Sequence, residues 1–293
     1  MSAPAPALRN PRSDRVRQVR ALAGRSARSR AGRFLVEGPQ AVREAVRFAP
    51  ERVVDVYLTA ASAERYPEIA DAARDAGLWL HETADDVLAA MSADAQGVLA
   101  VARTWTTSLD DVLPRASGER SDGQATVPRL VALLAAVRDP GNAGTVIRAA
   151  DAAGADVVVL AAGSVEPFNP KVVRSTAGSL FHLPVVTGVT TSDAVAALRA
   201  SGLTVLAADG GGEHDLDDLS DRAAGVAGEA EDAAPDLRAP TAWLFGTEAQ
   251  GLSDAELALA DSSVRVPIRG HAESLNLATA ATVCLYASSR AQR

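Results

Sequence analysis

The chain has 293 residues, 47 % of them apolar and only 4 % aromatic, which is enough for one large or two modest globular domains with aliphatic cores. Its formal charge of −8 is uneven, because residues 1–33 hold nine Arg and one acid and so carry +8. If this charge were spread evenly, it would argue against a nucleic acid as partner. A basic segment favours one, since Arg binds phosphate bidentately, although a solvated tail is the alternative interpretation.

Several classes of protein are excluded by what the sequence lacks. A single cysteine, Cys284, excludes a disulfide framework and fits a reducing cytoplasm. No apolar run reaches the length of a membrane span, and the N-terminus lacks the apolar region of a signal peptide. The four histidines are scattered without Cys or carboxylate spacing that would hold a metal, so we expect no metal site.

The first part of the chain predicts a basic arm followed by a small α/β domain. Residues 1–33 are rich in Arg, Ala and Ser, and we expect them to be flexible and to attract phosphate. Residues 34–105 alternate between strand-like and helical patterns. The predicted strands are 34–36, 53–58, 78–80 and 97–102, and the predicted helices follow Gly38 and cover 63–76 and 83–91.

A linker is predicted at residues 106–129, because 114–129 are rich in Pro, Gly, Ser and charge without periodicity. Residues 130–293 then form the second domain. Its predicted strands are 130–137, 157–160, 185–186, 203–207, 241–245 and 263–266, and its predicted helices are 142–153, 171–180, 193–200, 254–259 and one that follows Ser274. Strands that alternate with helices predict an α/β fold with a mostly parallel sheet covered on both faces.

The segment 209–236 carries ten acids against one Arg. Its composition predicts an acidic surface insertion that buries no core, lies away from any RNA and can be replaced by a short linker.

Three strand-to-helix transitions in the second domain carry unusual polar loops. The sequences are DPGNAGTVIR after 130–137, GTEAQG after 241–245 and PIRGHAESLN after 263–266. Each loop alone has a structural explanation, with Asn142 and Ser274 as helix N-caps and the glycines as turn formers. Because ligands bind beyond the carboxyl ends of parallel strands, three such loops together predict a site. Signatures of dinucleotide-binding, P-loop and α/β-hydrolase sites are absent.

The three loops resemble, in order and spacing, the three motifs of the SpoU (TrmH) family of RNA ribose 2′-O-methyltransferases in the SPOUT superfamily. The residues that match are Asn142, Gly144 and Arg148, then Gly246, Glu248 and Gly251, then Pro267, Gly270, Ser274, Leu275 and Asn276. The segment FNPKVVRSTAGSLFHLPV resembles the stretch between the first two motifs. More weakly, residues 34–105 resemble the ribosomal-protein-like substrate-binding domain that many members carry in front.

The resemblance implies a SPOUT domain with a C-terminal trefoil knot, a rare exception to the absence of knots in proteins. It implies S-adenosylmethionine as cofactor, held by the knotted loops at Gly246, Val266, Ile268 and Leu275. It also implies a homodimer in which the site is shared between protomers.

The resemblance further implies that Arg148 assists deprotonation of the ribose hydroxyl. A guanidinium is always protonated, so we prefer Arg148 as a clamp on the adjacent phosphate that also stabilises the developing alkoxide. Pairing with Glu248 would be a purely structural role for this arginine. We expect Asn142, Glu248, Ser274 and Asn276 to orient ribose, arginine and loop, and His271 to be a bystander.

The sequence therefore predicts an S-adenosylmethionine-dependent RNA 2′-O-ribose methyltransferase. The front domain favours ribosomal RNA as substrate, because tRNA-modifying relatives commonly lack that domain. A tRNA 2′-O-methyltransferase is the alternative within the enzyme class. A non-catalytic RNA-binding protein on the same scaffold is the alternative outside it.

Overall fold

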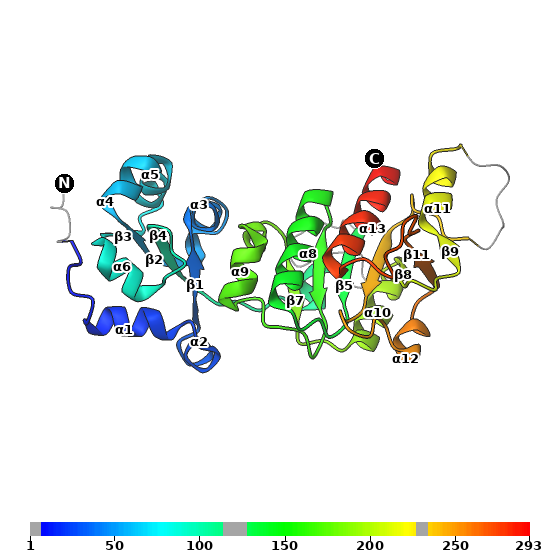
Figure 1. Cartoon of the computed structure of the whole chain (residues 1–293), viewed down its shortest axis with the longest axis horizontal. Coiled ribbons are helices and arrows are strands. Elements are labelled where there is room, and N and C mark those ends of the chain that lie inside the picture. Colours follow the sequence, from blue (N-terminus) through cyan, green and yellow to red (C-terminus); the bar gives the residue numbers. More distant parts are fainter. Residues whose placement is uncertain (1–6, 114–127, 227–233) are drawn as a thin grey trace. The chain divides into compact units, whose positions relative to one another are not determined.

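The computed structural model describes residues 7–113, 128–226 and 234–293, which fall into two units (Figure 1). The first unit contains the described part of residues 1–105 together with residues 166–182. The second contains the described parts of 106–165 and 183–293. No helix among the described residues is long and apolar enough to cross a membrane.

The first unit is built on a four-stranded sheet in the order β1-β4-β2-β3. Strand β4 is antiparallel to both β1 and β2, whereas β3 runs parallel to β2 at the edge. The elements are α1 (Asp14–Ala21), α2 (Arg25–Ala31), β1 (Arg33–Glu37), α3 (Pro39–Phe48), η1 (Pro50–Arg52), β2 (Val53–Leu58), α4 (Ala60–Arg65), α5 (Pro67–Asp75), β3 (Trp79–Glu82), α6 (Asp85–Met91), β4 (Val98–Arg103), α9 (Pro170–Thr176) and η2 (Ser179–Phe181).

Helices cover both faces of this sheet, with α1 on one side and α3 and α5 on the other (Figure 1). Helices α1 and α6 pack on Leu35, Tyr57, Leu99 and Val101, which point to one face because successive strand residues alternate. The four predicted strands are confirmed within a residue or two. The helix predicted over 63–76 is wrong in one respect: it is two helices, because Pro67 cannot supply the backbone N–H that a continuous helix needs.

The expectation of a flexible arm at residues 1–33 is wrong for its described part. Residues 14–21 and 25–31 are helical, and Val16, Val19 and Leu22 are buried in the core of the first unit. These three residues recur at intervals of three, so they form one apolar stripe on α1. The high Arg content of the segment concealed this stripe, and the helix is part of the domain.

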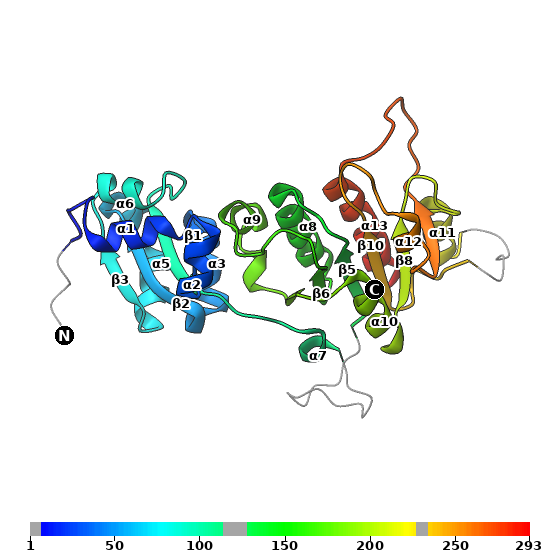
Figure 2. The ribbon, with the colours of Figure 1, turned by 90° about the horizontal axis from the view of Figure 1, so that it is seen from below.

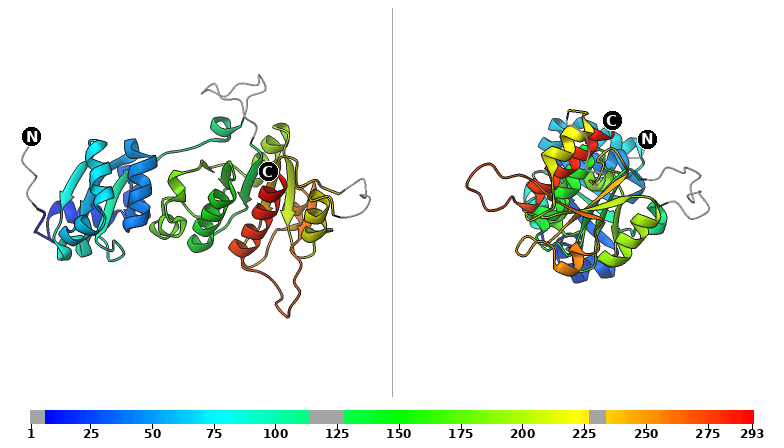
Figure 3. Two further views of the ribbon diagram at one scale, coloured as in Figure 1. Left: turned by 90° about the horizontal axis from the view of Figure 1, so that it is seen from above. Right: turned by 90° about the vertical axis from the view of Figure 1, so that its right-hand side faces the viewer.

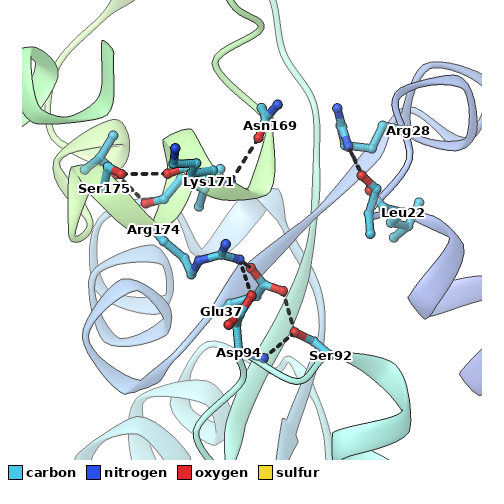
Figure 4. A network of polar contacts seen from close by, with 12 residues as sticks. Leu22, Arg28, Glu37, Ser92, Asp94, Asn169, Lys171, Arg174 and Ser175 are labelled. Atoms are coloured by element: carbon cyan, nitrogen blue, oxygen red, sulfur yellow. Dashed lines mark hydrogen bonds and ion pairs between the residues drawn. The ribbon is translucent and has the colours of Figure 1, made fainter. Parts of the chain in front are cut away.

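Residues 166–182 pack in the first unit although they lie far along the chain. Their aromatic rings Phe168 and Phe181 lie 4.7 and 6.4 Å from the ring of Phe34 in β1. Arg174 of α9 pairs with the buried carboxylate of Glu37 and, over 3.0 Å, with Asp94 (Figure 4). The helix predicted over 171–180 is a short α-helix followed by the 3-10 turn η2.

The second unit has a seven-stranded sheet in the order β7-β6-β5-β10-β8-β11-β9, with every neighbouring pair parallel. This confirms the predicted parallel α/β architecture. The elements are α7 (Leu109–Val112), β5 (Leu130–Leu134), α8 (Pro140–Ala153), β6 (Val157–Leu160), β7 (Val185–Thr187), α10 (Thr191–Ala200), β8 (Thr204–Ala208), β9 (His214–Asp215), α11 (Leu216–Ala223), β10 (Thr241–Phe245), α12 (Asp254–Leu257), β11 (Ser262–Arg265) and α13 (Leu277–Ala291).

Both faces of this sheet are covered, as the unbroken apolar runs of its central strands predict. All residues of β5, β6 and β10 are buried. Helices α8 and α13 pack against each other and on one face, where Trp243 donates a hydrogen bond from Nε1 to Ser288 Oγ over 2.9 Å. Helices α7, α10 and α12 close the core on the other face.

The expectation of a dispensable acidic insertion at 209–236 is wrong for residues 214–223. Strand β9 extends the sheet beside β11, and Leu216 and Leu219 of α11 are buried. The acids of α11 occupy its solvent side, so composition averaged over the segment hid an amphipathic helix. Residues 227–233 lie outside the described part of the chain.

The predicted linker at 106–129 is described only at its ends, because residues 114–127 lie outside the described part. Its first part is structured: α7 begins after a capping box at Ser108, and Val112 and Leu113 are buried in the second unit.

Candidate functional site

The site lies where four neighbouring strands of the second unit end. Strands β5, β10, β8 and β11 are adjacent and parallel, so the loops after Leu134, Phe245, Ala208 and Arg265 meet at one edge of the sheet. The three loops predicted to form a site are among them. The fourth, after β8, was assigned by sequence to the acidic insertion.

The residue that caps α8 is Asp139, whereas the sequence analysis expected Asn142. Asp139 Oδ1 accepts a hydrogen bond from Asn142 N over 2.8 Å, and Pro140 occupies the first helical turn. Gly154 ends the helix in the left-handed conformation. Because Asp139 satisfies the cap, the side-chain amide of Asn142 is available for other contacts.

Asn142 joins the other two motifs. Its Nδ2 donates to Glu248 Oε1 over 3.1 Å, and its Oδ1 accepts from Asn276 Nδ2 over 3.1 Å. Asn276 is itself the N-cap of α13 and accepts from Ala278 N over 2.9 Å, so the expected cap at Ser274 is wrong. One chain of side-chain hydrogen bonds therefore links residues that are more than a hundred positions apart.

Arg148 lies two turns into α8, on the same helix as Asn142, and is exposed. Within the described residues no hydrogen bond or ion pair holds its guanidinium. The structural pairing with Glu248 considered above is absent, since that carboxylate accepts from Asn142. The charge of Arg148 is thus directed to solvent, where a ligand can reach it.

A cavity of about 680 Å³ lies beside this hydrogen-bonded chain. All four residues predicted to contact the cofactor line it: Gly246, Val266, Ile268 and Leu275. Ile268 and Leu275 are 39 % and 38 % exposed, which is unusual for large aliphatic side chains and typical of a surface that a ligand covers. Both belong to the loop between β11 and α13, which projects from the second unit (Figure 2, Figure 3).

The remaining predicted residues divide between the cavity and its border. Ser274 and Glu248 also line the cavity, whereas Asn142, Asn276 and Arg148 do not. His271 is not part of the lining either.

Gly246 is needed for the shape of the second loop. A Cβ atom at this position would lie 2.1 Å from the carbonyl carbon of Gly251, closer than any side chain could approach. The loop returns on itself through two hydrogen bonds between the backbones of Thr247 and Gly251, of 2.9 and 3.0 Å. This tight turn holds Glu248 toward Asn142.

Sequence reasoning missed two charged residues of the cavity. Asp209 follows β8 directly, and Arg265 ends β11. Arg265 donates to the carbonyl of Gly212 over 3.0 Å and pairs with Asp215 over 3.3 Å, so it ties β9 to the third loop. The rule that polar residues at the carboxyl ends of parallel strands build sites would have identified Asp209.

The cavity is acidic, because three carboxylates, Asp209, Glu248 and Glu273, line it against the single cation Arg265. Cys284 lies behind it in the core, where complete burial raises the pKa of its thiol to about 12 and so keeps it protonated. Among the described residues no group of three or more His, Cys, Asp or Glu side chains could hold a metal ion.

Two parts of the chain match known families. Residues 129–286 match the SpoU rRNA Methylase family, and residues 13–100 match the MRM3-like substrate binding domain. The second match begins at Ser13, the N-cap of α1, and so includes that helix, which agrees with its packing in the first unit.

Two of the similar proteins are named as 23S rRNA methyltransferases. The chain is 32 % identical over 302 residues to the 23S rRNA (uridine(2479)-2'-O)-methyltransferase of Streptomyces viridochromogenes, which covers 95 % of this chain and 90 % of the relative. It is 40 % identical over 162 residues to the 23S rRNA (guanosine(2553)-2'-O)-methyltransferase RlmP of Bacillus subtilis, covering 54 % of this chain and 57 % of that one.

Two solved structures resemble this protein over nearly its whole length. The SpoU methyltransferase AviRb from Streptomyces viridochromogenes in complex with the cofactor AdoMet has a TM-score of 0.74 at 31 % identity, covering 95 % of this chain and 98 % of that one. The AdoMet-bound rRNA methyltransferase from Sinorhizobium meliloti has a TM-score of 0.72 at 26 % identity, covering 97 % of both. With the three motifs meeting at one sheet edge, these likenesses show that the chain belongs to the SpoU family of rRNA methylases and carries a SPOUT-type methyltransferase domain behind a substrate-binding domain.

Proposed function

We propose that this protein transfers a methyl group from S-adenosylmethionine to a ribose 2′-hydroxyl of ribosomal RNA. The observation that carries the proposal is the hydrogen-bonded chain Glu248–Asn142–Asn276 at the border of the cavity. Arg148 lies on the same helix as Asn142 and has no polar partner within the part of the chain that the structure describes. The names of the relatives, which are 23S rRNA 2′-O-methyltransferases, support ribosomal RNA as the substrate class.

The lining of the cavity fits the cofactor. S-adenosylmethionine carries a sulfonium and an ammonium group against one carboxylate, so its net charge is positive, and three carboxylates against one arginine complement that charge. The half-exposed side chains of Ile268 and Leu275 offer apolar surface to an adenine ring. The AdoMet complexes of AviRb and of the Sinorhizobium meliloti enzyme support the assignment.

The cofactor, when bound, supplies an electrophilic methyl group. The role of the protein is to bring a ribose hydroxyl into line with that methyl group and to stabilise the charge that forms on the hydroxyl oxygen. We assign the second task to Arg148, whose permanently protonated guanidinium binds the neighbouring phosphate bidentately and faces the developing alkoxide. Arg148 takes up no proton in this scheme: as the new bond between the ribose oxygen and the methyl carbon forms and the methyl–sulfur bond breaks, the hydroxyl proton passes to solvent.

Asn142, Glu248 and Asn276 act in this proposal as positioning residues. Their hydrogen bonds fix the first turn of α8 against the second and third loops, which sets where Arg148 stands relative to the cavity. Ser274 has an exposed hydroxyl at the cavity, where it can donate to the ribose or to the cofactor.

We further propose a homodimer in the cytoplasm and a knotted arrangement of the three loops, as the resemblance to the family implies. The exposed side chains of Val283 and Tyr286 lie one turn apart on α13 and provide an apolar surface for a second copy. Sedimentation of the wild-type protein and of Val283→Asp would test the dimer: we expect the variant to sediment as a monomer.

Transfer of a labelled methyl group from S-adenosylmethionine to total RNA tests the activity. We expect label in ribosomal RNA, at one 2′-O-methyl position when the modified sites are mapped with and without the protein. Label in tRNA would favour the tRNA enzyme. Binding of RNA without any transfer, while the cofactor is bound, would contradict the catalytic assignment and favour a scaffold that only binds RNA.

A further inference from the structure

One face of the sheet in the first unit is left open at its edge strand. Trp79, the first residue of β3, is 72 % exposed although tryptophan is usually covered. Within the described residues no other ring and no cation stacks on its indole. Its neighbour on β2 is Asp55, and because the two are paired in register their side chains lie on the same face.

A cavity of about 530 Å³ is lined by Asp55, the strand neighbour of Trp79, although Trp79 itself is not part of the lining. It lies between α1, α2 and the sheet, and three exposed arginines line it: Arg15, Arg30 and Arg33. The remaining charged residue of its lining is Asp55, whose carboxylate is already engaged by His81 Nε2 at 2.8 Å. The cavity therefore presents a net positive charge.

The floor of the cavity does not offset this charge. Tyr57 lies there, stacked on His81 with ring centroids 4.9 Å apart. Burial, assisted by the charge of Asp55, raises the pKa of Tyr57 to about 12, so the phenol stays neutral at physiological pH. An anionic ligand meets three guanidinium groups against one carboxylate, and of the three Arg15 already pairs with that carboxylate, Asp55, over 3.6 Å and contacts His81 Nε2 at 2.9 Å.

An anion-binding cavity beside an uncovered indole face suits one kind of ligand. Single-stranded RNA exposes unstacked bases and one phosphate per nucleotide, and proteins recognise it by stacking bases on aromatic rings and binding phosphates with Arg. A duplex cannot offer a base to Trp79 without being opened. A protein partner would need a larger apolar patch, whereas Phe48 is the only other exposed large hydrophobic side chain among the described residues of the first unit.

We propose that Trp79 with Arg15, Arg30 and Arg33 forms the subsite by which the first unit binds a single-stranded segment of the RNA substrate. One base stacks on Trp79, and the adjoining phosphates bind the arginines. This inference rests on the proposed function, because it names the part of the RNA that the substrate-binding domain recognises.

The test measures the affinity of the full-length protein for a short single-stranded RNA. Trp79→Ala is expected to weaken binding about 5- to 150-fold, the usual effect of losing one stacked base. Trp79→Phe should recover part of the loss, because an aromatic face remains. Arg74→Ala is the matched control for loss of an arginine, since Arg74 is exposed on α5 at the opposite face of the sheet and should leave affinity within two-fold.

Salt dependence tests the arginines separately. Each of Arg15→Gln, Arg30→Gln and Arg33→Gln should reduce the slope of log affinity against log salt by about 0.7, because one counterion fewer is released from a single strand. Trp79→Ala should leave the slope unchanged. A slope that falls equally in Arg74→Ala would show a diffuse charge effect and would overturn the subsite.

Fluorescence shows directly whether a base reaches the indole. The protein has three tryptophans; Trp243 is fully buried and Trp105 packs on Phe34 and Phe168. Single-stranded RNA should quench emission in the wild type but not in Trp79→Phe, and a duplex of the same length should quench neither.

Failure of the RNA subsite can be distinguished from failure of the proposed methyltransferase function. If the wild type methylates ribosomal RNA while Trp79→Ala binds single strands as tightly as wild type, the subsite is wrong and the enzyme stands. If the wild type binds RNA through Trp79 but transfers no methyl group, the subsite stands and the activity fails. A circular dichroism spectrum and a thermal unfolding curve of Trp79→Ala that match the wild type confirm that the variant is folded.

Discussion

Each unit contains a polar network that joins distant parts of the chain, and the two networks differ in burial. In the first unit Arg28 is 2 % exposed and donates to Glu166 over 2.9 and 3.1 Å. The buried Glu37 pairs with Arg174 (Figure 4). In the second unit the chain Glu248–Asn142–Asn276 lies at the surface, and Arg148 on the same helix as Asn142 has no polar partner among the described residues.

The difference in burial indicates that the network of the first unit stabilises the fold, whereas the network of the second unit serves the reaction. A buried ion pair is strongly destabilising to break, because the partner left behind is an uncompensated charge. Amide contacts at the surface contribute little to stability, since water replaces them readily. We therefore expect substitutions in the first network to lower the free energy of unfolding, and substitutions in the second to lower turnover.

The largest effect is expected for Arg28→Ala. This change removes the bonds to Glu166 and those to the carbonyls of Leu22 and Ala23, so the free energy of unfolding should fall by about 3–5 kcal/mol. Arg25→Ala is a matched control, because Arg25 approaches the same carboxylate at 3.8 Å while 86 % exposed, and it should cost about 0–1 kcal/mol. Urea unfolding measures the free energy of unfolding of both variants. An equal decrease in the two variants would refute the role of burial.

Arg148→Ala should leave stability unchanged and lower turnover by about 10²–10³, as the loss of one oxyanion donor does. Arg148→Lys should recover little, because an ammonium lacks the planar fork that grips a phosphate. Single-turnover methylation measures the rate, and calorimetric titration should give parental affinity for the cofactor. Near-parental turnover in Arg148→Ala would exclude the catalytic assignment.

Asn276 both caps helix α13 and donates a hydrogen bond to Asn142, and two variants separate these two roles. Asn276→Ala loses the cap of α13 and should cost about 1 kcal/mol, whereas Asn276→Asp keeps a capping oxygen and should be as stable as the parent. Both lose the bond to Asn142 Oδ1, so both should lose turnover by an amount worth about 0.5–1.5 kcal/mol. Parental turnover in the stable Asp variant would show that the hydrogen-bonded chain serves the fold alone.

The smallest effect is a pH dependence in the first unit. Burial acts to raise the pKa of Asp55, but the hydrogen bond and charge of His81 and the charges of Arg15 and Arg33 outweigh it, so the pKa is lowered. The folded protein therefore holds this proton less tightly than the unfolded chain. The stabilisation is present above the unfolded pKa of about 3.9 and is lost as pH falls through the folded value.

Thermal unfolding between neutral and acid pH checks this. The wild type should lose stability below about pH 4 more steeply than Asp55→Asn, which has no proton to take up there. If the stabilities of the wild type and of Asp55→Asn fell in parallel with pH, the lowered pKa assigned to Asp55 would be contradicted.

The fold could be predicted where local pattern and tertiary burial agree. The runs at β5, β6 and β10 are unbroken because these strands are buried on both faces, so apolar content alone located them. Helices α1 and α11 were missed because their apolar stripes are short and set among charges, which dominate any average over the segment. The place of residues 166–182 could not be read at all, because it depends on contacts with Phe34 and Glu37 far away in the sequence.

At the site, the sequence located the loops but not their contacts. Asp139 and Asn142 are both good capping residues three positions apart, as are Ser274 and Asn276 two apart, and only the backbone geometry decides between them. That decision matters, because it frees the amide of Asn142 to bind Glu248 and Asn276. The positions proposed for catalysis and cofactor binding stay predictions until variants are measured.

The place of residues 166–182 in the first unit has a consequence for biosynthesis. A protein emerges from the ribosome N-terminus first, and domains generally fold as units in that order. Here the first unit cannot complete its aromatic cluster until Phe181 has been made, when β5 and β6 of the second unit have already emerged. The two units must therefore mature together, and a fragment that stops at Trp105 would expose Phe34 to chaperones or to aggregation.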